Sequence, residues 1–331
     1  MTRLENRVYK KLGMTICSTV LLFAVASSAA IAQNDDDQLQ QALQDANIPQ
    51  DIIARLSPDS KYRVGGTVHV RTERAEGWEW DHQVRIYLPP SYEVTDKMYP
   101  TLWVTDNNLE MIQAALSGES LGFTQELIVV AIGPPADVNP AEFQRRRTYD
   151  FIPPTEELGP LLGMNPADSV GGAAGFLDFI ADQLRPKLAE EYRLDLNDQG
   201  YAGHSGGAQF GLYVLLNKPE SFHKYIISSP AAYQTWLDME ARYFEQNKDL
   251  KAKVFLSAGE EEFAHAIWSG SQIGSTVATM ADRLMARAYP SLDLTVRIFP
   301  GEDHLTVIPV AYTRGIRTLW GIIPELSLIH I

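Results

Sequence analysis

Cysteine is almost absent from this chain, because Cys17 is the only one in 331 residues. It lies inside the N-terminal apolar run and lacks the small residues that precede a lipid-modified cysteine. If that run is removed from the mature chain, disulfide and thiol chemistry are excluded. Histidine and cysteine also form no cluster with metal-ligand spacing, so neither a metal nor an organic cofactor is expected.

Basic residues are scarce as well. Lys and Arg number 28 against 42 Asp and Glu, which gives a net charge of −14 at pH 7. This balance argues against nucleic acid as a partner, since phosphate binding requires a basic face. The composition, 45% hydrophobic and 21% charged, is that of a globular protein with one large domain or two small ones.

Long hydrophobic runs are limited to one, MTICSTVLLFAVA, at about residues 14–26. Four basic residues precede it, and the small-residue string SSAAIA follows and ends at Ala32. This pattern predicts a signal peptide over residues 1–32, cleaved after Ala32, and a periplasmic or secreted protein. The alternative is a membrane anchor, but the run is short for a bilayer span, so no stable membrane span is expected after cleavage.

Short apolar runs alternate with helical patterns over residues 61–325, which we expect to form one domain after an acidic tail at 33–60. The expected strands lie at 82–90, 101–106, 127–135, 224–230, 252–260 and 294–302. The expected helices lie at 175–192, 234–248, 272–288 and 306–321. This alternation predicts an α/β fold with a mostly parallel central sheet and helices on both faces.

One segment interrupts the alternation. Residues 134–172 contain seven prolines and several glycines, and no sustained period is visible. A connection of this length in a compact domain is more often a binding loop or lid than a plain link. We therefore expect a lid-like insertion there.

The stretch YAGHSGGAQFG, residues 201–211, contains the pattern G-x-S-x-G around Ser205. A short strand (about 200–204) precedes it and a helical run follows, which is the context of a nucleophile elbow. In such a turn the small neighbours relieve crowding. The backbone N–H of Gly206 would then point at the carbonyl oxygen of a bound acyl group.

A serine needs a base to take its proton, and in this kind of sheet the order is Ser, acid, His. His304 follows the last expected strand and is the expected base, with His265 as the other histidine to consider. The acid should follow the strand at 252–260, where Glu262 is the first choice and Glu260 the second. A second oxyanion donor is expected from the backbone of Asn107.

Three residues are candidate substrate contacts. Arg146 belongs to a run of three arginines and could bind an anionic or catecholate group. Trp236 could stack on a ring, although core packing is the commoner fate of tryptophan. His204 is next to the nucleophile.

The chain resembles a family of α/β-hydrolases named "Putative esterase", which includes esterase D-like, enterochelin-type siderophore and feruloyl esterases. The matching pieces run in order over about residues 62–321, among them VRIYLPPSYE, YPTLWVTDNN, RRRTYDFIPP, YAGHSGGAQFGLYVLL, VFLSAGEEE and GEDHLTVIPVAYTRGIRTLW. The resemblance implies Ser205 as nucleophile, His304 as base and an acid within 260–262. The chain departs from the family at Asn107, where glycine is frequent, at Glu261, where leucine is frequent, and at Gly206, where a bulkier residue is common.

These features predict a serine carboxylesterase that hydrolyses a small-molecule ester through an acyl-enzyme. The alternatives are an acyltransferase with the same three residues and an exported binding protein that keeps the fold without turnover. Short acyl, feruloyl-sugar and siderophore lactone esters all remain open as substrates, and so does the oligomeric state.

Overall fold

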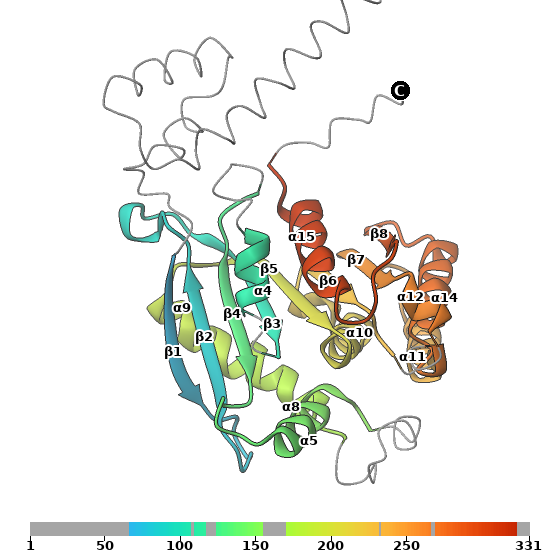
Figure 1. Cartoon of the computed structure of the whole chain (residues 1–331). Coiled ribbons are helices and arrows are strands. Elements are labelled where there is room, and N and C mark those ends of the chain that lie inside the picture. The colour runs from blue at the N-terminus through green and yellow to red at the C-terminus, as the bar shows by residue number, and fades with distance from the viewer. Residues whose placement is uncertain are drawn as a thin grey trace, which may run out of the picture. The chain divides into compact units, whose positions relative to one another are not determined.

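Eight strands form the central sheet of the computed structural model (Figure 1). The structure describes residues 66–106, 109–116, 124–154, 170–231, 233–265 and 269–322, all within one unit, Asp59–Ile331. The expected signal peptide and acidic tail lie outside the described residues. Within the described ranges, no helix has the length and apolar character needed to cross a membrane.

The sheet has the strand order β1-β2-β4-β3-β5-β6-β7-β8. β1 and β2 pair antiparallel with their neighbours, and every pair from β4 to β8 is parallel. The strands are β1 (Thr67–Glu73), β2 (His82–Leu88), β3 (Tyr99–Thr105), β4 (Ile128–Gly133), β5 (Leu194–His204), β6 (Lys224–Ser228), β7 (Ala252–Gly259) and β8 (Leu292–Phe299). The six strands expected from apolar runs are confirmed to within three residues at each end. The short strand expected at about 200–204 is the last part of the longer β5, and β1 was not expected.

Helices cover both faces of the sheet. α4 and α15 pack on one face, while α8, α9, α10, α11 and α14 pack on the other (Figure 1). The helical segments are α4 (Leu109–Leu116), α5 (Pro140–Phe151), α8 (Ala173–Asp178), η3 (Phe179–Leu184), α9 (Arg185–Glu191), α10 (Gly206–Asn217), α11 (Tyr233–Gln246), α12 (Glu261–Ala264), α14 (Ile273–Arg287) and α15 (Val307–Trp320), with short η1 (Tyr92–Val94) and η4 (Pro219–Ser221). This arrangement confirms the expected α/β-hydrolase fold.

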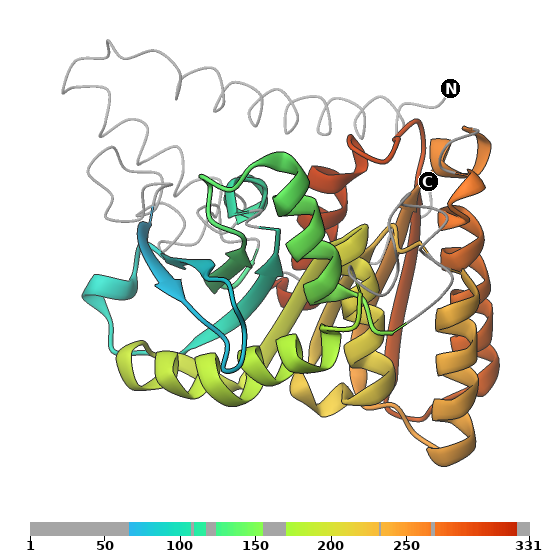
Figure 2. The same cartoon turned by 90° about the horizontal axis from the view of Figure 1, so that it is seen from below.

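α8, η3 and α9 follow one another without a break and form one long helix (Figure 2). This confirms the helix expected at 175–192. η3 is a π-helical segment, and Pro186 stands in the first turn of α9 directly after it. Proline removes a backbone donor and disturbs the preceding turn, which accounts for the wider winding there.

The expectation for residues 134–172 was wrong in one respect, because the segment contains helix α5. Asn139 begins the helix, and its side chain accepts a hydrogen bond from the Glu142 backbone N–H at 3.0 Å. Pro140 occupies the first turn, where its missing N–H costs nothing. The helix carries few apolar residues and therefore shows no helical period in the sequence. Residues 155–169 of the expected lid lie outside the described residues.

A buried hydrogen bond between His82 and Asp150 joins α5 to the sheet. His82 on β2 lies 2.8 Å from the Asp150 carboxylate, measured from Nε2 to Oδ2, and both side chains are shielded from solvent. Burial raises the pKa of Asp150, while the hydrogen bond to His82 opposes this. The rings of Phe176 and Phe179 lie 5.5 and 5.2 Å from the His82 ring. The pair thus holds α5 against β2 from inside the apolar core.

Candidate active site

Ser205 occupies a sharp turn between β5 and α10, at the carboxyl end of the parallel strands. Its backbone has φ 55° and ψ −115°, a conformation that non-glycine residues seldom adopt. The Ser205 N–H donates to the Ser228 carbonyl at 2.9 Å, which ties the turn to β6. A side chain at Gly203 would meet the Gly207 backbone at 2.4 Å, so glycine is required for this close approach.

His304 lies in the loop between β8 and α15 and faces the serine. Its Nε2 is 3.0 Å from the Ser205 hydroxyl oxygen. The ring is 7% exposed and packs against the His204 ring, with centroids 4.5 Å apart. The structure therefore brings together two residues separated by 99 positions in the chain.

Glu262, in the short helix α12, lies on the other side of the His304 ring. Its Oε1 accepts from His304 Nδ1 at 2.5 Å. Its Oε2 accepts from the Ser229 hydroxyl at 2.8 Å and from the Gly259 N–H at 2.7 Å. The carboxylate is completely buried and has a donor on each oxygen. Since it only accepts, Nδ1 of His304 carries the proton, and Nε2 is left to accept from Ser205.

Glu260, the second choice for the acid, makes other contacts than Glu262. Glu260 is exposed, and its carboxylate accepts from the Gly301 N–H at 2.9 Å. The Glu260 N–H in turn donates to Phe299 at 2.9 Å. Glu260 thus joins the loop after β7 to the loop that carries His304 and does not reach the imidazole itself. His265 is exposed at the end of α12.

Of the two expected oxyanion donors, Gly206 lies within the described residues. Gly206 directly follows Ser205 and is the first residue of α10, so its N–H has no intrahelical partner. Asn107 lies outside the described residues. Its neighbour Asp106 ends the β3 segment with φ 64°, also a left-handed backbone.

One of the three expected substrate contacts is wrong. Trp236 is 0% exposed, and its indole N–H donates to the Ala231 carbonyl at 2.6 Å, so it belongs to the core and cannot stack on a ligand. Arg146 is held by Glu142 at 2.7 Å on α5. His204 is 6% exposed and packs against the His304 ring. Substrate contacts by Arg146 and His204 stay predictions.

The contacts of two groups at the site were not expected from the sequence. Ser229 donates to Glu262, and its own φ of 57° aims the hydroxyl at that carboxylate. Arg147, next to Arg146 in the run of three arginines, pairs with Asp106 beside the Ser205 turn. Ser229 lies in the strand-end motif SSP and Asp106 in the strand-end motif TD, but neither motif indicates which residue its side chain contacts.

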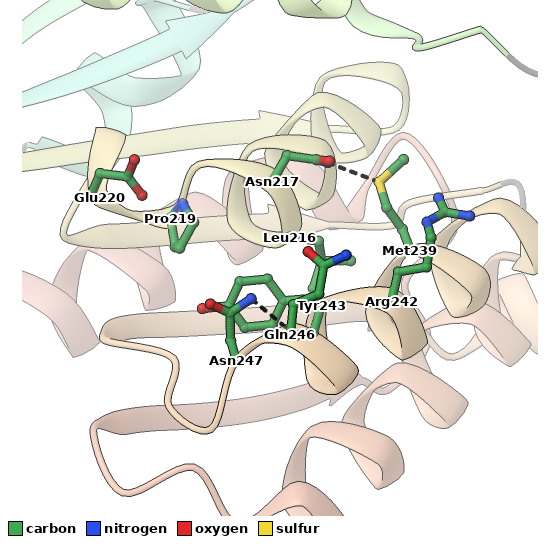
Figure 3. Close-up of a pocket in the computed structure, with 9 residues that line it drawn as sticks. All are labelled: Leu216, Asn217, Pro219, Glu220, Met239, Arg242, Tyr243, Gln246 and Asn247. Atoms are coloured by element: carbon green, nitrogen blue, oxygen red, sulfur yellow. Dashed lines mark hydrogen bonds between the residues drawn. The ribbon is translucent and has the colours of Figure 1, made fainter.

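A pocket lies at the end of α10 away from Ser205. It has a volume of about 390 Å³ and opens where α10 ends and α11 turns toward β7 (Figure 3). Its lining residues are Leu216, Asn217, Pro219, Glu220, Met239, Arg242, Tyr243, Gln246 and Asn247. Ser205 is at the opposite end of α10, about 16 Å away along the helix axis. Among the described residues, no group of three or more His, Cys, Asp or Glu side chains is placed to hold a metal ion.

The burial of His204 makes stability depend on pH. Burial, with the nearby His304 and Arg147, lowers the pKa of His204 well below the usual 6.5. The unfolded chain therefore binds a proton near pH 6.5 that the folded chain does not bind, so the free energy of unfolding falls as pH drops below this value.

His204→Asn should reduce this dependence. We expect the variant to lose less stability than the wild type between pH 7.5 and 5.5, by up to about 1.4 kcal/mol per pH unit below the unfolded pKa. Urea unfolding at the two pH values measures the difference. Equal pH slopes for the two proteins would contradict the prediction.

The family model described as "Putative esterase" matches residues 75–283 of the chain. The siderophore enterobactin esterase of Emericella nidulans is 36% identical over 220 residues, covering 58% of this chain and 71% of that protein. The ferri-bacillibactin esterase BesA of Bacillus subtilis is 31% identical over 152 residues. That match covers 44% of this chain and only about half of BesA, 51%.

Solved structures show the same fold. The siderophore hydrolase EstA from Aspergillus nidulans superimposes with a TM-score of 0.68 at 23% identity, covering 77% of this chain and 94% of EstA. The BES protein from Bacillus cereus gives a TM-score of 0.63 at 23% identity, covering 77% and 95%. Together with the match over most of the domain, these findings show that the chain belongs to this esterase family.

Proposed function

We propose that this protein hydrolyses carboxylic esters with Ser205 as the nucleophile, His304 as the general base and Glu262 as the acid. The observation that carries the proposal is the continuous hydrogen-bonded chain from Ser205 Oγ through both nitrogens of His304 to Glu262. Membership of an esterase family supports the reaction class.

The reaction follows from these contacts. Ser205 Oγ attacks the ester carbonyl carbon while His304 Nε2 takes the hydroxyl proton. The resulting oxyanion accepts from the Gly206 N–H and, in this proposal, from the Asn107 N–H. The C–O bond then breaks, and His304 returns the proton to the leaving alcohol. Water attacks the acyl-enzyme by the same steps, which releases the acid and restores Ser205.

Glu262 supports His304 in two ways. The carboxylate holds the ring in the tautomer that leaves Nε2 free to accept, and its charge stabilises the imidazolium formed during attack. Ser229 and Gly259 occupy the second carboxylate oxygen, so the first is left for His304. Burial keeps water away from this pair and strengthens the interaction.

Replacement of the three residues tests the mechanism. We expect Ser205→Ala and His304→Ala to lower kcat on p-nitrophenyl acetate by about 10³-fold or more, and Glu262→Gln by a smaller but still large factor. Labelling by a fluorophosphonate should disappear in Ser205→Ala. The control is Glu261→Gln, because Glu261 is exposed beside the acid. Full activity in Ser205→Ala would overturn the proposal.

For the substrate, we propose an ester of a siderophore. The support is that several relatives carry such names, including a siderophore triacetylfusarinine C esterase of Aspergillus fumigatus, 28% identical over 244 residues.

Kinetics on a substrate panel tests this assignment. A catecholate trilactone should give a higher kcat/KM than nitrophenyl esters of any acyl length, with ring-opened products detected by mass spectrometry. Cleavage of the nitrophenyl esters without any cleavage of siderophore esters would remove the substrate assignment and leave the esterase assignment intact.

We further propose that residues 1–32 direct export, that the tail at 33–60 precedes the catalytic domain at 61–325, and that the protein acts in the periplasm or outside the cell. The basic start, the short apolar run and the small residues before Ala32 support this. N-terminal sequencing of protein recovered from a secreting host should begin at Gln33. Retention of residues 1–32 on the recovered protein would contradict the proposal.

A further inference from the structure

Arg147 on α5 forms a two-pronged ion pair with Asp106 at the end of β3. Its Nε lies 2.5 Å from Oδ1 and its Nη2 lies 2.9 Å from Oδ2. Both side chains are largely shielded, with 16% and 11% exposed. A planar guanidinium paired with a carboxylate in this way has a fixed orientation, unlike a lysine at the same place.

The guanidinium lies directly over the first residue of α10. A methyl group at Gly206 would come within 2.7 Å of Arg147 Nη1 and 3.0 Å of Cζ and Nη2. The Asp106 carboxylate covers the next residue, since a methyl group at Gly207 would lie 3.5 Å from Oδ2. The ion pair therefore rests on the two glycines that follow Ser205.

The positive charge of Arg147 at the start of α10 is unfavourable unless a nearby negative charge compensates for it. The start of a helix carries partial positive charge, so a cation there is disfavoured. Although burial opposes the charge, the carboxylate of Asp106 raises the pKa of Arg147 above its usual value. The arginine thus stays charged, and the ion pair holds it against the turn.

Helix α5 is itself fixed to the sheet. Asp150 lies three residues after Arg147, and its buried pair with His82 anchors this part of the helix to β2. Arg147 therefore extends from a rigid support on one side and is held by β3 on the other.

We infer that Arg147 is a positioning residue for the nucleophile turn. With Asp106 it clamps the Gly206 backbone, so that the Gly206 N–H and the Ser205 hydroxyl keep the orientation that ester attack requires. Gly206 is needed because any side chain would push the guanidinium away. The inference rests on the proposed function, since it concerns the geometry of the same reaction.

A positioning role makes predictions that a charge-only or substrate-binding role does not. p-Nitrophenyl acetate is neutral and small, so loss of the clamp should lower kcat and leave KM nearly unchanged. A misplacement of about 1 Å costs on the order of 10²-fold in rate, so Arg147→Met should lose about ten- to a hundredfold in kcat. Arg147→Lys keeps the charge but not the planar contact, so it should lose a similar factor.

The coupling to Gly206 is the sharpest test. Gly206→Ala should lower kcat as Arg147→Met does, and the double variant should be no slower than the slower single variant, because both changes remove one contact. Arg145→Met is the matched control on the same helix, since Arg145 pairs with Glu142 in the first turn of α5. Its kcat should equal that of the wild type. Circular dichroism melts verify that each variant is folded.

Several outcomes would overturn the inference while the esterase assignment stands. These are a wild-type kcat in Arg147→Met, full recovery in Arg147→Lys, a change confined to KM, or multiplied losses in the double variant. The rate of Ser205 labelling by a fluorophosphonate gives a second reading that does not depend on the choice of ester, and it should fall in parallel with kcat. If the wild type neither hydrolyses esters nor is labelled at Ser205, the proposed function fails, and the inference fails with it.

Discussion

The left-handed backbone at Ser205 is the constraint around which the site is assembled. A φ of 55° is energetically unfavourable for a non-glycine residue, so the surrounding structure must stabilise it. The Ser228 carbonyl of β6 accepts the hydrogen bond of the Ser205 N–H, and the glycines at 203 and 207 leave room for the turn. The side chain of Thr105 on β3 fills the space where a Gly207 methyl group would be, at 2.2 Å. The serine hydroxyl is therefore placed by three strands and a helix acting together.

This acidic protein buries several carboxylates. Glu262, Asp150 and Glu240 are each almost completely shielded from solvent. Each has a cationic or imidazole partner: His304, His82 and Arg287, the last at 2.8 Å. An unpaired buried charge is strongly destabilising, so these partners are required wherever the carboxylates enter the core. Two of the three pairs also serve the site, one directly and one by anchoring α5.

The loops at the carboxyl edge are joined by backbone bonds as well as by side chains. Glu260 and Glu261 donate from their N–H groups to Phe299 and Glu302, at 2.9 and 3.1 Å. These bonds join the loop that carries Glu262 to the loop that carries His304.

Local patterns in the sequence were sufficient for seven of the eight strands, although not for the start of β5, and for the long helix, the serine turn and the position of His304 after the last strand, because each depends on residues close together in the chain. The tertiary structure decided the rest. It placed Glu262 rather than Glu260 at the imidazole, buried Trp236, and placed Arg147 beside the Ser205 turn. Helix α5 was missed because a capped polar helix has no apolar period to detect. Each of these choices depends on which side chains meet across the sheet, and contacts between distant segments leave no mark in local spacing.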